Sequence, residues 1–131
     1  TQRKVRFQHC DPAGIVFYPR YFEMINSVVE DWFEQDLHHD FNKLHVESGT
    51  GVPTAAIDTQ FHAPSRLGEL LTFELLVQAL GRSSLTLQIT AYCGDQKRLT
   101  SCSTLVFMDL NSGKSMPWTE AIRQRITVDN L

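Results

Sequence analysis

A single acidic side chain, Asp11, lies in a short segment whose residue types could support acid–base or nucleophilic chemistry. Pro12 biases the backbone of Asp11 toward an extended conformation, because the proline ring clashes with a helical conformation of the residue before it. Gly14 has no Cβ, so the chain can turn sharply there or let a ligand approach its backbone. Pro19 suits the first turn of a helix, where its missing N–H costs nothing. The segment therefore places one carboxylate close to one helix N-terminus.

Other candidate chemical groups are less well arranged. Cys10 is adjacent to Asp11, but no histidine forms a recognisable dyad with it, so a thiol nucleophile is not favoured. An acidic and histidine-rich stretch from residue 36 to residue 45 has no recognisable spacing of metal ligands. Its members are Asp36, His38, His39, Asp40 and His45. We therefore predict a solvated loop or short helix over residues 36–51, with neither a metal site nor a cofactor.

Periodic apolar residues predict the elements that position Asp11. Residues 3–10 alternate well enough for a first strand, with Val5 and Phe7 on one side. From Pro19 to about Glu34, apolar residues recur at the spacing of one helical face. These residues are Phe22, Ile25, Val29, Trp32 and Phe33.

The second half of the chain has the period-two pattern of strands. Strands are predicted at residues 53–62, 70–80, 84–93 and 100–109, with turns at residues 81–84 and 94–97. Thr119 is the predicted N-cap of a short helix that reaches Arg125. One strand, one long helix and a run of antiparallel strands predict an α+β fold.

Composition limits the classes of protein to which the chain could belong. Its 131 residues predict a single domain over residues 1–131. No apolar run approaches the roughly 20 residues that span a bilayer. The formal net charge is −3, and only Arg3, Lys4 and Arg6 cluster, so nucleic-acid binding is not expected. Three scattered cysteines do not form a disulfide framework, which favours the reducing cytoplasm.

The segment from Asp11 to Pro19, followed by Tyr21, resembles the acyl-CoA thioesterases of the hotdog fold, in the subgroup that includes 4-hydroxybenzoyl-CoA thioesterase. Residues 51–53 and the turn at residues 61–69 are similar to later landmarks of that family. The resemblance implies one long helix wrapped by an antiparallel sheet, and hydrolysis of an acyl-CoA to a free acid and CoA. Such hydrolysis needs few protein groups, because the departing thiol has a pKa of about 8.5 and leaves without strong protonation.

The resemblance also implies roles for individual residues. Asp11 matches an aspartate that acts as the nucleophile or as the general base, and both roles stay open. The backbone amide of Tyr18 matches the group that polarises the thioester carbonyl. Matching substrate-binding positions are Gly14, Phe17, Tyr21, Arg82, Ser83 and Ser84. The last three form a turn that is less basic than the phosphate-contacting turn of the family, and Arg66 is a second, weaker candidate for phosphate contact.

The family also implies a homodimer, or a dimer of dimers, with two sites at the subunit interface. Each site would combine Asp11 of one subunit with residues 51–60 of the other. The aromatic residues after Asp11 suggest an aryl or a short-to-medium acyl group. Two alternative functions are a non-catalytic acyl-CoA-binding domain, which acts as a regulator or scaffold, and a hotdog hydratase or dehydratase. Alternative carboxylates for the chemistry are Glu23, Glu30, Asp58 and Glu69, and His9 is a group that could tune Asp11.

Overall fold

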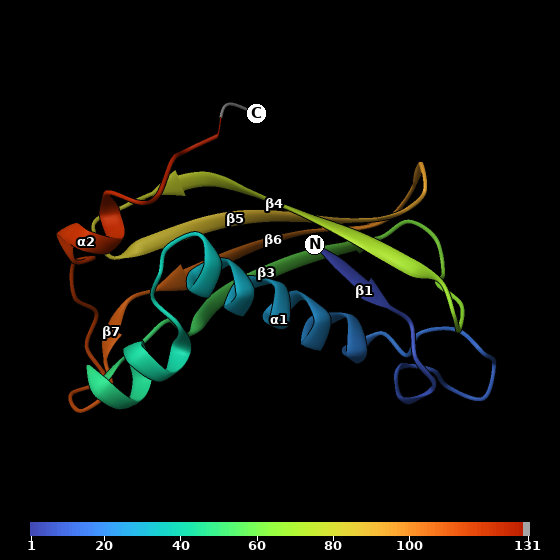
Figure 1. Cartoon of the computed structure of the whole chain (residues 1–131), viewed down its shortest axis with the longest axis horizontal. Helices are drawn as coiled ribbons and strands as arrows, with labels where there is room; N and C mark the ends of the chain where they lie inside the picture. Colours follow the sequence, from blue (N-terminus) through green and yellow to red (C-terminus); the bar gives the residue numbers. More distant parts are fainter. Residues whose placement is uncertain (130–131) are drawn as a thin grey trace.

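One long helix lies across one face of a five-stranded antiparallel sheet (Figure 1). The structure is a computed structural model that describes residues 1–129, with only the backbone of residues 46 and 47. The strand order is β1-β4-β5-β6-β3. The strands are β1 (Gln2–Lys4), β3 (Thr54–Phe61), β4 (Leu70–Leu80), β5 (Ser84–Cys93) and β6 (Gln96–Val106). The predicted α+β arrangement is confirmed.

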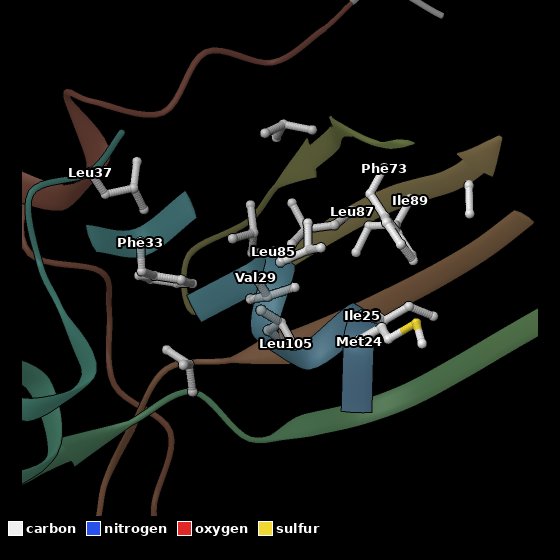
Figure 2. Close-up of a cluster of buried hydrophobic side chains, with 14 of the residues drawn as sticks. Met24, Ile25, Val29, Phe33, Leu37, Phe73, Leu85, Leu87, Ile89 and Leu105 are labelled. Atoms are coloured by element: carbon white, nitrogen blue, oxygen red, sulfur yellow. The ribbon is translucent and has the colours of Figure 1, made fainter. Parts of the chain in front are cut away.

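Helix α1 (Pro19–Gln35) begins at its proline, as the sequence predicts. Its apolar stripe packs on the side chains of the sheet, among them Leu85 and Leu87 of β5 and Leu105 of β6 (Figure 2). The buried residues of the helix are Tyr21, Met24, Ile25, Val28, Val29 and Phe33. Phe22 and Trp32, which the spacing also assigned to the stripe, are only half-buried and lie at its margins. Each fully buried large apolar side chain contributes about 1.5–3 kcal/mol, so this face fixes the helix on the sheet.

The central strands follow the predicted alternation. The four inward residues of β5 are fully buried, and they are Leu85, Leu87, Ile89 and Ala91. Strand β6 begins at Gln96, four residues earlier than predicted, because the turn before it needs only Gly94 and Asp95. Gly94 has a φ of +58°, a conformation that a two-residue hairpin turn commonly requires.

The prediction of a strand over residues 3–10 is wrong beyond Lys4. Val5 is fully buried, whereas Phe7 is 83% exposed, so the two side chains do not share a face. Beyond Val5 the chain forms a 3₁₀ turn, η1 (Phe7–His9), because His9 Nδ1 accepts a hydrogen bond from the Arg6 N–H at 2.8 Å. A side chain thus takes the backbone donor that a strand partner would have used.

Several short elements lie at the end of the sheet opposite the N-terminus of α1 (Figure 1). A π-helical segment, η2 (Asn42–Glu47), precedes β2 (Thr50–Gly51), which pairs with β7 (Met108–Asp109). A Cβ at Gly51 would lie 2.8 Å from Leu110 Cδ2, so the Leu110 side chain would have to move to admit any other residue. Helix α2 (Glu120–Arg123) is capped by the Thr119 hydroxyl as predicted, but it ends two residues before Arg125.

Strand β3 is an open edge of the sheet. Among the described residues, β3 pairs with β6 on one side and with no strand on the other. Seven of its eight residues are exposed, and these include the large apolar residues Ile57 and Phe61, at 45% and 46% exposure. An edge strand with apolar residues and free backbone groups is a surface on which another strand can pair.

Candidate functional site

Residues 10–16 form a tight loop, here called the Asp11 loop, between η1 and α1. Its two ends meet where Cys10 pairs with Val16. Within the loop the Asp11 N–H donates to the Ile15 carbonyl at 3.0 Å, and the Gly14 N–H donates to the Asp11 carbonyl at 3.0 Å. Gly14 turns the chain with a φ of +80°, a conformation that suits glycine and strains other residues. Nothing lies within 4 Å of the place where its Cβ would be, so the backbone there is open to approach.

One oxygen atom of the Asp11 side chain forms a hydrogen bond within the loop. Its Oδ1 accepts a hydrogen bond from the Ala13 N–H at 2.8 Å, which is the turn-forming role expected of an aspartate before Pro-x-Gly. Within residues 1–129, Oδ2 accepts no hydrogen bond, and the residue is partly exposed. The turn therefore orients the carboxylate and leaves its second oxygen available for chemistry.

A backbone donor lies at the N-terminus of α1, close in sequence to the Asp11 loop. Tyr18 is the N-cap, and its carbonyl accepts the Tyr21 N–H at 3.1 Å, while the Phe17 carbonyl accepts the Arg20 N–H at 2.9 Å. In the described part of the chain the Tyr18 N–H itself has no acceptor. A free N–H at this end of a helix carries positive partial charge and attracts an anion or a polarised oxygen. The Phe17 N–H ties this end to the segment before Asp11 by a 2.9 Å bond to the His9 carbonyl.

Aromatic side chains surround the start of α1. Phe17 and Tyr18 are exposed, whereas Tyr21 is buried with its ring 5.5 Å from that of Phe61. Tyr18 also contacts the Phe61 ring edge to face, with centroids 6.4 Å apart. A cavity of about 310 Å³ opens here, lined by Ile15, Val16, Tyr18, Tyr21, Phe61, His62, Ala63 and Pro64. Phe61 was not among the predicted site residues, although an aromatic residue ending an exposed edge strand is a signal that could have indicated it.

A larger, mostly apolar cavity of about 590 Å³ lies farther along α1. It is lined by the middle of the helix, by η2, and by the segments around β3, β6 and β7. The lining residues are Phe22, Ile25, Asn26, Val29, Phe41, His45, Gly51, Val52, Pro53, Thr54, Ile57, Ser103, Leu105, Met108 and Leu110. Asp11 does not line it. The ring of His45 is oriented by a contact of 2.8 Å between Nδ1 and the Phe41 carbonyl.

The turn with the proposed phosphate-contacting residues lies at the other end of the molecule. Arg82, Ser83 and Ser84 join β4 to β5 beside α2, whereas the Asp11 loop lies beyond the opposite end of α1 (Figure 1). The turn is closed by the Gly81 N–H, which donates to the Ser84 carbonyl at 2.9 Å, and Arg82 is exposed. Within one chain the structure does not bring these residues to Asp11. Arg66 does lie beside the loop, where it pairs with Ile15.

The side chains of the remaining candidate residues either bond to other residues or are exposed to solvent. Glu23 forms an exposed ion pair with Arg20, and Asp58 and Glu30 are exposed. Glu69 is paired with Arg98. Partial burial lowers the pKa of His9, and its Nδ1 is occupied by the Arg6 N–H.

Over residues 1–129, no three His, Cys, Asp or Glu side chains are grouped so that they could hold a metal ion. Cys10, Cys93 and Cys102 are free thiols. No helix in the same range is both long enough and apolar enough to cross a membrane.

Proteins of known structure share this fold. A 1,4-dihydroxy-2-naphthoyl-CoA thioesterase from Synechocystis superimposes with a TM-score of 0.85 at 18% identity, over 95% of this chain and 92% of that one. A hypothetical protein from Staphylococcus aureus, solved in complex with CoA, gives a TM-score of 0.88 at 14% identity, over 95% of this chain and 78% of that one. These likenesses show that the helix and sheet form a hotdog fold.

Sequence similarity then identifies the family. The chain belongs to the Thioesterase-like superfamily, whose sequence profile matches residues 5–126. The resemblance drawn from the Asp11 motif is thereby confirmed. A 4-hydroxybenzoyl-CoA thioesterase from Pseudomonas sp. strain CBS-3 is 27% identical over 84 residues. That match covers 63% of this chain and 60% of the relative, so it spans less than two thirds of the relative's length.

Proposed function

We propose that this chain hydrolyses an acyl-CoA thioester to a free acid and CoA, with Asp11 and the Tyr18 N–H as its reacting groups. The observation that carries the proposal is that residues 11–18 present two polar groups without hydrogen-bond partners among the described residues. Asp11 Oδ2 accepts no hydrogen bond and the Tyr18 N–H finds no acceptor among the described residues. A free carboxylate oxygen and a free amide donor are the two groups that thioester hydrolysis requires.

The Tyr18 N–H would donate to the thioester oxygen as negative charge develops on it. One such donor contributes roughly 3 kcal/mol in the transition state. Asp11 then has two open roles. As a nucleophile, its oxygen attacks the carbonyl carbon, the C–S bond breaks, CoA leaves as a thiolate, and water hydrolyses the resulting anhydride. As a general base, it takes a proton from the water that attacks the carbonyl, the C–S bond breaks, and the proton passes to the departing CoA thiolate.

A homodimer paired along β3 would complete this site. Exposed backbone groups and the exposed side chains of Ile57 and Phe61 support pairing of two β3 strands. A two-fold axis at this edge would bring the start of β3 in the partner subunit toward the end of β3, where Phe61 contacts Tyr18. The 590 Å³ cavity of one subunit, which opens beside the start of β3, would then lie near the Asp11 loop of the other.

The acyl group proposed for this cavity is aryl or short to medium in length. A largely apolar lining supports this assignment, as does the partial similarity to an enzyme that is named for 4-hydroxybenzoyl-CoA. In the dimer the partner's turn with Arg82, Ser83 and Ser84 would lie at the same end as Asp11, as the nucleotide phosphates require. Gly14, Phe17 and Tyr21 would line the approach to the thioester. Three free thiols support a reducing compartment such as the cytoplasm.

Release of free thiol from a panel of aryl and aliphatic acyl-CoAs tests the reaction. We expect Asp11→Asn to lower kcat by about two to four orders of magnitude, because the amide is neither a nucleophile nor a base. Asp36→Asn is the matched control, since Asp36 is an exposed carboxylate at the end of α1, and it should keep wild-type kcat. Near wild-type turnover in Asp11→Asn would show that Asp11 only shapes its loop.

The same panel separates the alternative functions. A non-catalytic domain would bind acyl-CoA, as measured by calorimetry, without releasing thiol. A hydratase or dehydratase would change the acyl chain and leave the thioester intact, which mass spectrometry of the recovered CoA ester would reveal. Thiol release that requires Asp11 is the result that supports hydrolysis.

Mixed dimers test the shared site. Thr54 is exposed and lines the mouth of the larger cavity, so Thr54→Trp should block acyl binding without disturbing the core. Mixing inactive Asp11→Asn chains with inactive Thr54→Trp chains should restore part of the activity, because some dimers then hold one intact site. A fully active monomer in sedimentation at assay concentration would contradict the shared site.

A further inference from the structure

A buried arginine, Arg98, organises the turn between β3 and β4. Only 8% of its side chain is exposed. Its Nη1 donates to the Pro64 carbonyl at 3.0 Å, to Ser65 Oγ at 3.2 Å and to Glu69 Oε1 at 2.8 Å, while its Nη2 donates to Glu69 Oε2 at 2.9 Å. Its Nε donates to Gln96 Oε1 at 2.7 Å. A buried charge is costly without such partners, so the guanidinium fixes the conformation of residues 64–69.

Glu69 joins this arginine to the backbone of the same turn. Its Oε1 also accepts the Arg66 N–H at 2.6 Å. The hydrogen bonds from Arg98 and Arg66 lower the pKa of Glu69 to about 2, so the carboxylate stays ionised across the pH range of most assays. Bidentate pairing with an arginine is both strong and directional. Losing the Glu69 charge would leave the Arg98 charge buried and only partly paired.

This turn holds both flanks of the Asp11 loop. After Asp11, the Val16 N–H donates to the Ser65 carbonyl at 2.9 Å, and the Gly14 carbonyl accepts the Leu67 N–H at 3.4 Å. Before Asp11, Val5 exchanges two hydrogen bonds with the same turn. Its N–H donates to the Glu69 carbonyl at 2.8 Å, and its carbonyl accepts the Gly68 N–H at 2.9 Å.

We propose that the Glu69–Arg98 pair positions the catalytic carboxylate, by holding residues 64–69 in the conformation that fixes the Asp11 loop next to the Tyr18 N–H. This inference rests on the function proposed above. Glu69 and Arg98 are positioning residues, because their charged groups bond to each other and to the backbone of the turn, and they act on Asp11 only through that turn. Displacement of a reacting group by about 1 Å can cost a hundredfold in rate, so a loosened turn should slow the chemical step.

Glu69→Gln tests the proposal, with Asp31→Asn as its matched control. Both changes remove one carboxylate charge from a partly buried ion pair with an arginine, but the pair of Asp31 with Arg3 joins α1 to β1 and does not contact the turn at residues 64–69. In Glu69→Gln we expect kcat to fall about ten- to a hundredfold with little change in KM. Amide hydrogen exchange, measured by NMR, should be faster at Val16. Asp31→Asn should keep both properties at wild-type values.

Three results would overturn the inference. The first is wild-type kcat in Glu69→Gln, and the second is unchanged Val16 exchange in that variant. The third is an equal loss of kcat in Asp31→Asn, which would indicate a general loss of stability. If Glu69→Gln does not fold, Ser65→Ala decides, because it removes one hydrogen bond between Arg98 and the turn. A several-fold loss of kcat with faster Val16 exchange would support the proposal, and wild-type values of both would overturn it.

The measurements also separate this proposal from the proposed function. If the unaltered protein hydrolyses no acyl-CoA, the proposed function fails. The Val16 exchange rate does not depend on turnover, so it still decides whether the Glu69–Arg98 pair fixes the Asp11 loop.

Discussion

The Tyr18 N–H provides the sharpest test of the proposed chemistry, because a backbone donor can be removed without changing any side chain. Incorporating 4-hydroxyphenyllactic acid at position 18 replaces the amide N–H by an ester oxygen. The Tyr18 N–H has no acceptor among residues 1–129, so its removal breaks no hydrogen bond of the fold. The Phe17 carbonyl becomes a weaker acceptor for the Arg20 N–H, which lies 2.9 Å away, and this should cost under about 1 kcal/mol of stability.

The expected loss of activity is much larger than this loss of stability. Removing one donor that stabilises a developing oxyanion costs about 10²–10³ in kcat, equivalent to ~2.7–4 kcal/mol. A donor used only in the transition state changes kcat and leaves KM nearly unchanged. Stopped-flow or steady-state release of free thiol from the best acyl-CoA measures both constants.

The same analogue at Tyr92 is the control for ester substitution. Tyr92 lies within β5, where it pairs with Thr72 of β4, and it is outside the proposed site. The ester there should lower the melting temperature by disturbing the sheet while kcat stays at the wild-type value. A kcat within twofold of wild type for the ester at Tyr18 would refute its role as the oxyanion donor.

Two further predictions concern the coenzyme and the Glu69 carboxylate. Arg82→Ala should raise KM for CoA esters severalfold, and less for esters of a truncated thiol without phosphates; an equal rise for both would show that Arg82 meets no phosphate. Because the pKa of Glu69 is lowered from 4.5 to about 2, its ionised form stabilises the fold fully above pH 4.5, and this contribution is lost as pH falls toward 2. Since the side chain is 29% exposed, we expect the stability advantage of wild type over Glu69→Gln to be about 1–3 kcal/mol at pH 7. Urea denaturation should show this advantage shrinking between pH 4.5 and pH 3, and a constant difference would contradict the prediction.

The sequence predicts the long elements well, because their information is local. The apolar spacing after Pro19 defines α1, and the period-two pattern defines β4 and β5. The end of the first strand is predicted wrongly, because it is set by hydrogen bonds to a distant turn and to a side chain. Val5 bonds to a turn more than 60 residues away, and His9 takes the Arg6 N–H. No local pattern contains either partner.

The candidate site likewise has a part that depends on local sequence and a part that depends on distant residues. The Asp11 turn and the start of α1 are contiguous, so their residue types indicate both a carboxylate and a backbone donor. The pair of Glu69 with Arg98 joins residues that are 29 positions apart, so no local pattern contains both partners. The core-facing residues of β6 are Leu99, Ser101, Ser103 and Leu105, so the period-two pattern assigns Arg98 to the opposite face, where an arginine is expected to be exposed. Only the fold shows that it lies inside.

The pairing of β1 with β4 has a consequence for the order of events in folding. Gln2 lies opposite Thr72, so the first strand has no partner until about 70 further residues have been synthesised. Hairpins β4–β5 and β5–β6 join neighbouring stretches of chain and can close quickly, whereas contacts of high sequence separation close late. The ribosome therefore releases the apolar face of α1 before strands β3, β4, β5 and β6 of the sheet that covers it. During this interval the exposed apolar face makes the nascent chain prone to aggregation.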